Sequence, residues 1–403
     1  MTWKPIINGS EKREIINIID EIAEILILNK DETEIIGLFS GKTGVALFLY
    51  YYSRYSLNKD SLYEAKKLIE SVYDAINSGF NRSAFGGGIS GIVWCIKHLE
   101  TVGFINKNEI NSFSSINDFF VKALSYHCEK ENFDFIYGST GIVNYLLERN
   151  SIGSDAYSKY IEALESFGEA EKGSIKWKSV IDKDKQDYGY NLSLSHGIAA
   201  IIVVLSKIQQ SNYRIKKTKK ILTQSINFIL SKKQNTNNYI SNFPNLISKK
   251  IKYGNSRLAW CYGDLGIGIA LYIASISLND QILEKESLQI LRHSTNRVSL
   301  LENSVIDAGI CHGTAGIAQI YSRMYSYTNE QVFRNSAKYW INQTLKMARF
   351  KDGLYANLVL GERIDECEIR KVMKECKIEH LIFNTSMETK IYEKGVNVSG
   401  GEK

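Results

Sequence analysis

Two short segments carry side chains suited to bind a metal ion: residues 261–263 read Cys-Tyr-Gly, and residues 311–313 read Cys-His-Gly. Each segment is followed by small residues and then by an apolar, helix-like run. Two thiols and an imidazole thus recur at the same point of a repeated unit. If the units stack side by side, Cys261, Cys311 and His312 come together and leave one position of a zinc ion open, as in catalytic zinc sites.

The same cysteines could instead be ordinary buried thiols, because free cysteine is often part of a protein core. The six cysteines of the chain are sparse and lack the spacing of a disulfide framework. The N-terminal segment has no apolar signal core, and no run reaches the roughly 18 apolar residues that suggest a membrane span. We therefore expect a cytoplasmic protein, whose reducing surroundings keep cysteine ligands free.

The composition favours a large helical protein. Of 403 residues, 44% are hydrophobic and only two are proline, while helix-forming residues are abundant. The formal net charge of +6 is modest for this length. The lysine cluster within residues 216–220 is interpreted as a solvated helix face, so we expect no nucleic-acid partner.

The elements that would position the site come from a repeat, Gly-x-x-Gly followed by an apolar helical run. Its six copies begin at Gly41, Gly88, Gly138, Gly197, Gly263 and Gly313, and the copy at Gly197 is degenerate. Neighbouring copies lie roughly 47 to 66 residues apart, a period typical of helical hairpins. Each unit is predicted to pair an apolar inner helix with an amphipathic outer helix. In a stacked ring the inner-helix N-termini, with their free N–H groups, would surround one mouth.

The residues before these glycines resemble the signatures of the LanC family, the lanthionine synthetase C cyclases. The resemblance is carried by WCYGDLGIG at 260–268, CHGTAGIAQIY at 311–321 and LSLSHGIAAI at 192–201, and it runs from about Ile35 to about Arg349. It implies an all-α fold, an α/α toroid of inner and outer helices. It also implies a bound zinc ion, with Cys261, Cys311 and His312 as ligands.

The activity implied by the resemblance is the addition of peptide cysteine thiols to dehydroalanine or dehydrobutyrine, which forms the thioether rings of lantibiotics. Zinc lowers the pKa of a bound thiol, and the addition leaves an enolate that an acid must protonate. His196 matches the family's candidate acid/base, a role that histidine in general can fill near neutral pH. Asp134 could orient that histidine, charge it or bind substrate. Arg257 could stabilise the enolate oxygen, and Tyr262 matches a family tyrosine.

Each of these four residues also has a purely structural interpretation. His196 could be a structural histidine at a helix start whose hydrogen bonds are already satisfied. Asp134 could be a helix cap. Arg257 could belong to a surface ion pair, and Tyr262 could serve packing alone.

The C-terminus departs from the family pattern, because no seventh repeat follows the sixth. Instead residues 351–403 resemble part of an ABC-transporter ATPase. Residues 354–365 resemble the entry to its helical subdomain, and residues 398–402 stand in the place of its signature. No P-loop motif occurs. We therefore predict a LanC-like toroid over 1–350, lacking its last repeat, and an ABC-like tail over 351–403. A flexible tail is the alternative.

The leading prediction is a zinc-dependent cyclase that acts on a dehydrated lanthipeptide precursor. The resemblance also implies a LanB-type dehydratase and an ABC exporter as partners, and the exporter would bring the chain to the inner face of the membrane. The alternatives are an inactive scaffold in that complex and a LanC-like enzyme that adds glutathione to dehydroamino acids. An α/α-toroid glycosidase is disfavoured, because the mouth positions offer Cys, His and Tyr in place of paired carboxylates.

Overall fold

The computed structural model describes residues 5–7, 9–106, 116–149, 154–182, 187–211 and 216–347. The chain divides into two compact units, of which the first contains Met1–Ser179 and Gly189–Val359 and the second Val180–Tyr188 and Leu360–Lys403. Most of the second unit lies outside the described residues, and so does the ABC-like tail over 351–403. That tail and the boundary at residue 350 stay predictions.

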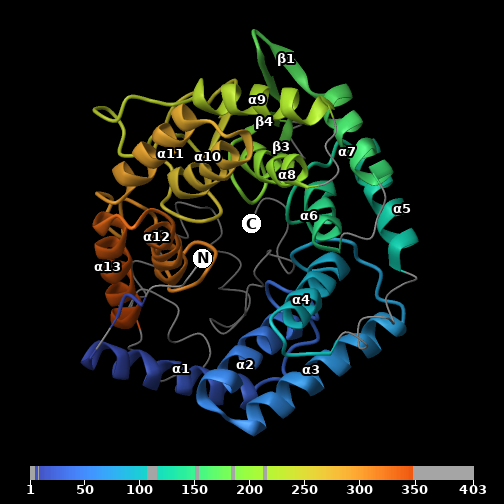
Figure 1. Ribbon diagram of the computed structural model, residues 1–403, viewed down its shortest axis with the longest axis vertical. Helices are drawn as coiled ribbons and strands as arrows, with labels where there is room; N and C mark the ends of the chain where they lie inside the picture. The colour runs from blue at the N-terminus through green and yellow to red at the C-terminus, as the bar shows by residue number, and fades with distance from the viewer. Residues whose placement is uncertain are drawn as a thin grey trace, which may run out of the picture. The chain divides into compact units, whose positions relative to one another are not determined.

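The first unit is a double layer of helices. The inner helices are α2 (Lys42–Ser56), α4 (Ile89–Thr101), α6 (Ser139–Arg149), α8 (Ile198–Gln210), α10 (Asp264–Leu278) and α12 (Thr314–Thr328). The outer helices are α3 (Lys59–Asn77), α5 (Ile116–Glu129), α7 (Ser154–Phe167), α9 (Lys216–Leu230), α11 (Gln281–Ser294) and α13 (Gln331–Met347). From α2 to α10 each inner helix contacts the next, and Figure 1 shows the inner helices following one another inside the outer ones. None of the described helices is long and apolar enough to span a membrane.

Inner helices begin where the repeat predicts. Five of them have the first glycine of a copy as N-cap: Gly41, Gly88, Gly197, Gly263 and Gly313. The backbone explains the second glycine of the pattern, since a Cβ at Gly316 would lie 1.9 Å from the carbonyl oxygen of Ile310. Only glycine lets the loop before the helix pass so close. We call the residues directly before each first glycine the entry loop of that repeat.

Backbone groups close four of the six entry loops in the same way. The carbonyl six residues before the first glycine accepts the N–H of the residue after that glycine. This bond joins Ile35 to Lys42, Arg82 to Ile89, Asn132 to Ser139 and Asp307 to Thr314, at 2.7–3.0 Å. One of the otherwise unpaired N–H groups at the helix start is thereby satisfied. No side chain takes part in this bond, so the side chains of the entry loops are available for other contacts.

The core has two parts. The larger hydrophobic cluster joins residues of the hairpins from α2 to α10, and a smaller one joins α12, α13 and parts of α10 and α11. Ile6, which precedes α1 (Ser10–Leu28), is 5% exposed and belongs to the smaller cluster, while α1 packs on α2 and α3. The start of the chain thus contacts both the last and the first hairpin. No inner helix follows α13 in the described residues, and Ile310 before α12 is 69% exposed.

Short strands interrupt the helical pattern, which the sequence did not predict. β1 (Glu169–Glu171) pairs with β2 (Ser174–Lys176), and a three-stranded sheet has the order β3 (Ser179–Asp182), β4 (Asp187–Asn191), β5 (Leu246–Ser248). In the pair β4–β5, Tyr190 lies opposite Ile247. These strands occupy the long stretches between repeats, where the apolar helical spacing is absent. β4 leads directly into the entry loop of α8.

Candidate functional site

The entry loops of α10 and α12 bring together the three side chains predicted to bind a metal. Cys261, Cys311 and His312 each offer one ligand atom, and these atoms all lie within 4.8 Å of one another. The loops are joined by their backbones, because the Cys261 N–H donates to the Cys311 carbonyl at 3.3 Å. The stacking of equivalent repeat positions therefore produces the cluster.

The donor set of this cluster fits zinc. Thiolate sulfur and imidazole nitrogen are the ligands that zinc prefers in proteins, and three protein ligands leave a fourth tetrahedral position open. Zinc–ligand bonds of about 2.0–2.3 Å place ligand atoms roughly 3.3–3.8 Å apart. The three possible ligand atoms, all within 4.8 Å of one another, lie near that spacing.

The two thiols of the cluster are joined by a hydrogen bond, which shifts their pKa values in opposite directions. A hydrogen bond from Cys311 lowers the pKa of Cys261 more than burial raises it, and the Arg257 guanidinium adds to the lowering. The same bond, together with burial, raises the pKa of Cys311. Cys261 is thus the readier thiolate, while Cys311 has to lose its proton when a metal binds.

The third candidate ligand, His312, is hydrogen-bonded to a carboxylate. The Nε2 atom of His312 lies 3.0 Å from Oδ2 of Asp307. This hydrogen bond raises the pKa of His312 to about 9. Burial raises the pKa of Asp307, but the bonds from His312 and from the Gly309 N–H outweigh burial and lower it overall. Asp307 was not among the predicted site residues, although it stands six residues before the glycine of its repeat, as Arg257 does.

A second aspartate–histidine pair lies in neighbouring entry loops. Nδ1 of His196 is 2.7 Å from Oδ2 of Asp134, and the Tyr137 N–H donates to Oδ1 of Asp134 at 2.8 Å. The pair joins two residues that the sequence singled out separately. The Nε2 atom of His196 has no hydrogen-bond partner among the described residues, and the side chain is 29% exposed. That nitrogen is free to exchange a proton with a ligand.

Two tyrosines flank the His196 ring. The ring of Tyr137 stacks on it with centroids 5.8 Å apart and an interplanar angle of 18°, and the ring of Tyr262 lies 6.2 Å away. Burial raises the pKa of Tyr262, whose hydroxyl accepts a hydrogen bond from Asn191 at 3.4 Å. Because Tyr262 directly follows Cys261, it connects the metal cluster to the histidine pair. Tyr137 occupies the same repeat position as His196, a signal that could have identified it.

Arg257 lies beside the metal cluster. Its Nη2 atom donates to the Ser304 carbonyl at 2.7 Å, and its charge acts on both Cys261 and Asp307. Its Nε atom is buried and has no partner among the described residues. The side chain is therefore anchored through Nη2 and, within the described part of the chain, has an unpaired donor at Nε.

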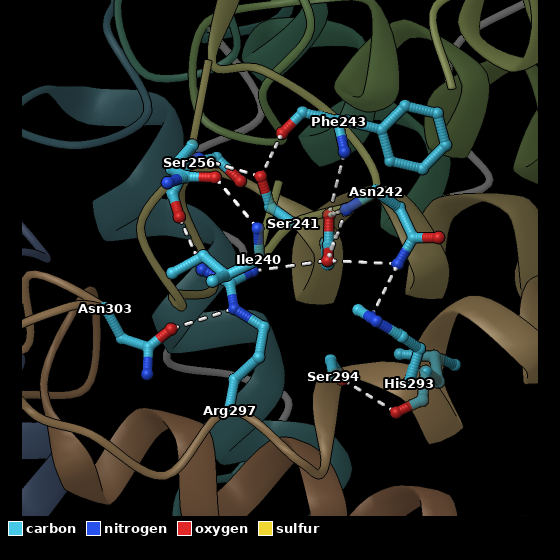
Figure 2. A network of polar contacts seen from close by, with 12 residues as sticks. Ile240, Ser241, Asn242, Phe243, Ser256, His293, Ser294, Arg297 and Asn303 are labelled. Carbon is cyan, nitrogen blue, oxygen red and sulfur yellow. Dashed lines mark hydrogen bonds and ion pairs between the residues drawn. The ribbon is translucent and has the colours of Figure 1, made fainter. Parts of the chain in front are cut away.

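A buried polar network supports the entry loop that carries Arg257 and Cys261. Asp264, in the first turn of α10, is fully buried. Its carboxylate accepts the N–H groups of Asn242 and Phe243 at 2.9–3.1 Å. Figure 2 shows Asn242 and Phe243 on one segment and Arg297 on another, all reaching this network. The glycine pattern contains Asp264 but gives no sign of this role.

Arg297 completes the network. Its Nη1 atom pairs with Asp264 at 3.2 Å, its Nε donates to Asn303 at 2.8 Å, and its Nη2 donates to the Ser256 carbonyl. Burial lowers the pKa of this guanidinium, while Asp264 opposes that effect. Residues 240–243, 256–264 and 297–304 are thereby fixed relative to one another. Segment 256–264 contains Arg257, and segment 297–304 contains Ser304, whose carbonyl accepts the hydrogen bond from Arg257.

Comparison with known proteins identifies the family of the chain. The sequence model of the family described as "Lanthionine synthetase C-like protein" matches residues 9–353. The chain belongs to the LanC-like family. NisC, the nisin biosynthesis protein of Lactococcus lactis subsp. lactis, is 24% identical over 352 residues, which cover 80% of this chain and 82% of NisC.

A solved structure agrees with the fold. The structure named nisin cyclase matches with a TM-score of 0.69 at 20% identity and covers 84% of this LanC-like chain and 89% of its own. The predicted all-α double ring is thereby confirmed, with a few short strands added.

Proposed function

We propose that this LanC-like chain is a zinc-dependent lanthionine cyclase. Its reaction would add cysteine thiols of a dehydrated precursor peptide to dehydroalanine or dehydrobutyrine residues of the same peptide. One observation carries the proposal: a Cys-Cys-His cluster with ligand atoms within 4.8 Å lies next to an aspartate–histidine pair that has a free nitrogen. The similarity to NisC and to nisin cyclase supports the same reaction class.

Three residues would hold the ion. Cys261, Cys311 and His312 supply the ligands and leave one coordination position for substrate. When bound, zinc lowers the pKa of a substrate thiol, so that its thiolate is available near neutral pH. The buried network around Asp264 keeps the Cys261 loop in place, because its hydrogen bonds fix that loop at both ends.

The addition requires that the substrate thiol lose one proton and that the α-carbon of the dehydro residue gain one. The thiol loses its proton, the sulfur bonds to the β-carbon of the dehydro residue, and the carbon–carbon double bond opens to an enolate. We assign to Nε2 of His196 the transfer of a proton to the α-carbon. Asp134 keeps Nδ1 protonated and stabilises the charged ring. The spare Nε donor of Arg257 would stabilise the enolate oxygen.

The partners follow from the same proposal. A chain that closes thioether rings needs a precursor whose serines and threonines have already been dehydrated, and hence a dehydratase such as the LanB type. A finished lantibiotic has to leave the cell, which calls for an ABC exporter and would bring the chain to the membrane face. Co-purification of tagged chain with each of these two proteins tests this part separately.

The decisive experiment measures zinc and cyclisation in the same samples. Cys261→Ala, Cys311→Ala and His312→Ala are expected to lower bound zinc from one ion per chain and to abolish ring formation. Ring formation is followed by mass spectrometry of free thiols left in a dehydrated precursor peptide. Cys128→Ala is the matched control, because Cys128 is buried in the hydrophobic core outside the site. Ring closure at the unaltered rate by any of the three variants would exclude the zinc mechanism.

A further inference from the structure

Asp307 lies in the entry loop of α12 and is held from two sides. Its Oδ2 atom is 3.0 Å from Nε2 of His312, and its Oδ1 accepts the Gly309 N–H at 2.7 Å. Its backbone carbonyl accepts the Thr314 N–H at the start of α12 at 3.0 Å. The side chain is 19% exposed. The carboxylate therefore has a fixed orientation that does not depend on a bound ligand.

The loop is built around this carboxylate. A Cβ at Gly313 would lie 2.2 Å from Oδ1 of Asp307, and one at Gly309 would lie 2.9 Å from the same atom. Such distances are too short for any side chain to remain without moving the carboxylate. Gly309 thus makes room for the carboxylate of Asp307, which is an observation independent of its contact with His312. At Gly313 a Cβ would also meet backbone atoms of residues 307 and 309, at 2.2–2.4 Å.

An imidazole ring has two nitrogens, and Asp307 is hydrogen-bonded to one of them, Nε2 of His312. With Nε2 donating to the carboxylate, Nδ1 is the nitrogen left for the thiols of Cys261 and Cys311, which lie within 4.8 Å of the His312 ligand atom. A hydrogen bond to one nitrogen fixes both the tautomer and the direction of the ring. We propose that Asp307 is a positioning residue that holds His312 with Nδ1 toward the metal site. This inference rests on the proposed zinc centre.

The first test is the zinc affinity of Asp307→Asn. The amide is isosteric and can still accept the Gly309 N–H, but it lacks the charge that holds the imidazole proton. We expect zinc affinity, measured by competition with a chromophoric chelator, to fall by about 10–100-fold. The absorption bands of the cobalt-substituted protein should change as well. Asp134→Asn is the matched control, since it makes the same change in the other aspartate–histidine pair and should leave zinc affinity unaltered.

The second test separates positioning from plain charge. If Asp307 acts through His312, the Asp307→Asn change has no further effect on zinc affinity in a His312→Ala background. An equal loss in both backgrounds would mean that the carboxylate acts on the ion only as a nearby charge, and the proposal would be wrong. Gly309→Ala provides a second variant, because its Cβ displaces the carboxylate without removing it. A loss of zinc affinity is expected there too.

The outcomes distinguish this inference from the proposed function. Wild-type protein that binds zinc tightly, together with an Asp307→Asn variant that binds it equally well with an unchanged cobalt spectrum, overturns the inference alone. Wild-type protein that binds no zinc overturns both. Weakened zinc binding in Asp307→Asn and Gly309→Ala, with unchanged melting of the zinc-free proteins and no additional effect on His312→Ala, supports the inference.

Discussion

At the scale of single residues, the two histidines of the site contact their aspartates through different ring nitrogens. Asp134 takes Nδ1 of His196, and Asp307 takes Nε2 of His312. A neutral imidazole has one donor and one acceptor nitrogen, so each aspartate decides which nitrogen faces away from it. The nitrogen that faces away from the aspartate is Nε2 in His196 and Nδ1 in His312. The two rings are therefore not interchangeable, although both stand directly before the first glycine of a repeat.

Replacing the proposed acid separates chemistry from metal binding. His196→Asn removes the ring but no metal ligand, so we expect bound zinc to stay at the wild-type level. Cyclisation should slow by about 10²–10⁴-fold, the usual contribution of a general acid. Single-turnover reactions with a dehydrated peptide, read by mass spectrometry, measure the rate. A wild-type rate in this variant would assign proton transfer to another group.

The buried thiol of Cys95 predicts loss of stability at high pH. Burial raises its pKa from 9.0 to about 12, so the folded state holds the proton more firmly than the unfolded state does. The corresponding stability is complete below pH 9 and is lost as the pH rises toward 12. Urea unfolding at pH 8 and pH 10.5 should show a smaller pH effect in Cys95→Ala than in wild type. An identical pH effect in the two proteins would contradict this assignment.

At the scale of elements, the buried ion pair of Asp264 and Arg297 connects helix α10 to two loops. Both side chains are at most 3% exposed, and their hydrogen bonds go mainly to loop backbone. A buried pair of this kind adds little net stability over an apolar pair, but losing one partner leaves a charge without compensation. Its role is to fix where the entry loop of α10 lies.

Removing the arginine tests that role. Arg297→Met should lower the free energy of unfolding in urea by about 3–5 kcal/mol and should weaken zinc binding, because the Cys261 loop loses its support. Arg292→Met is the matched control. Arg292 pairs with Glu330 at 2.7 Å but is 42% exposed, so its loss should cost less than about 1 kcal/mol. Similar costs for the two variants would show that the buried network has no special part in the fold.

The sequence predicted these elements unevenly. The inner helices were predictable because glycine spacing and apolar runs are local signals. The proximity of Cys261, Cys311 and His312 was predictable because they stand at the same point of neighbouring repeats. The contact of Asp134 with His196 was left open, since it depends on how two repeats stack. Asp307 and Arg297 carried no signal of their own, because each acts through groups that only the fold brings near. The short strands of residues 169–191 were missed because strands of three to five residues leave no clear pattern.

At the scale of the whole molecule, apolar residues of the N-terminal segment pack against the last hairpin of the first unit. Ile6 lies in the cluster of α12 and α13. We expect Ile6→Ala to lower the free energy of unfolding by about 2–5 kcal/mol, as for other buried aliphatic residues. Leu28→Ala is the control, since Leu28 is 81% exposed. Equal urea midpoints for the two variants would show that the N-terminal segment does not stabilise the last hairpin.

Backbone bonds between entry loops also join repeat to repeat. The N–H two residues before the first glycine donates to the carbonyl at the same position of the next repeat, from Phe39 to Gly86, from Gly86 to Ile136 and from Cys261 to Cys311. These bonds depend on no side chain, so the scaffold tolerates a change of residue type around its rim. Ser40 and Gly87 stand where other repeats carry Tyr137, His196, Tyr262 and His312. New reactive side chains could thus be introduced at Ser40 and Gly87 without redesigning the backbone that joins the repeats.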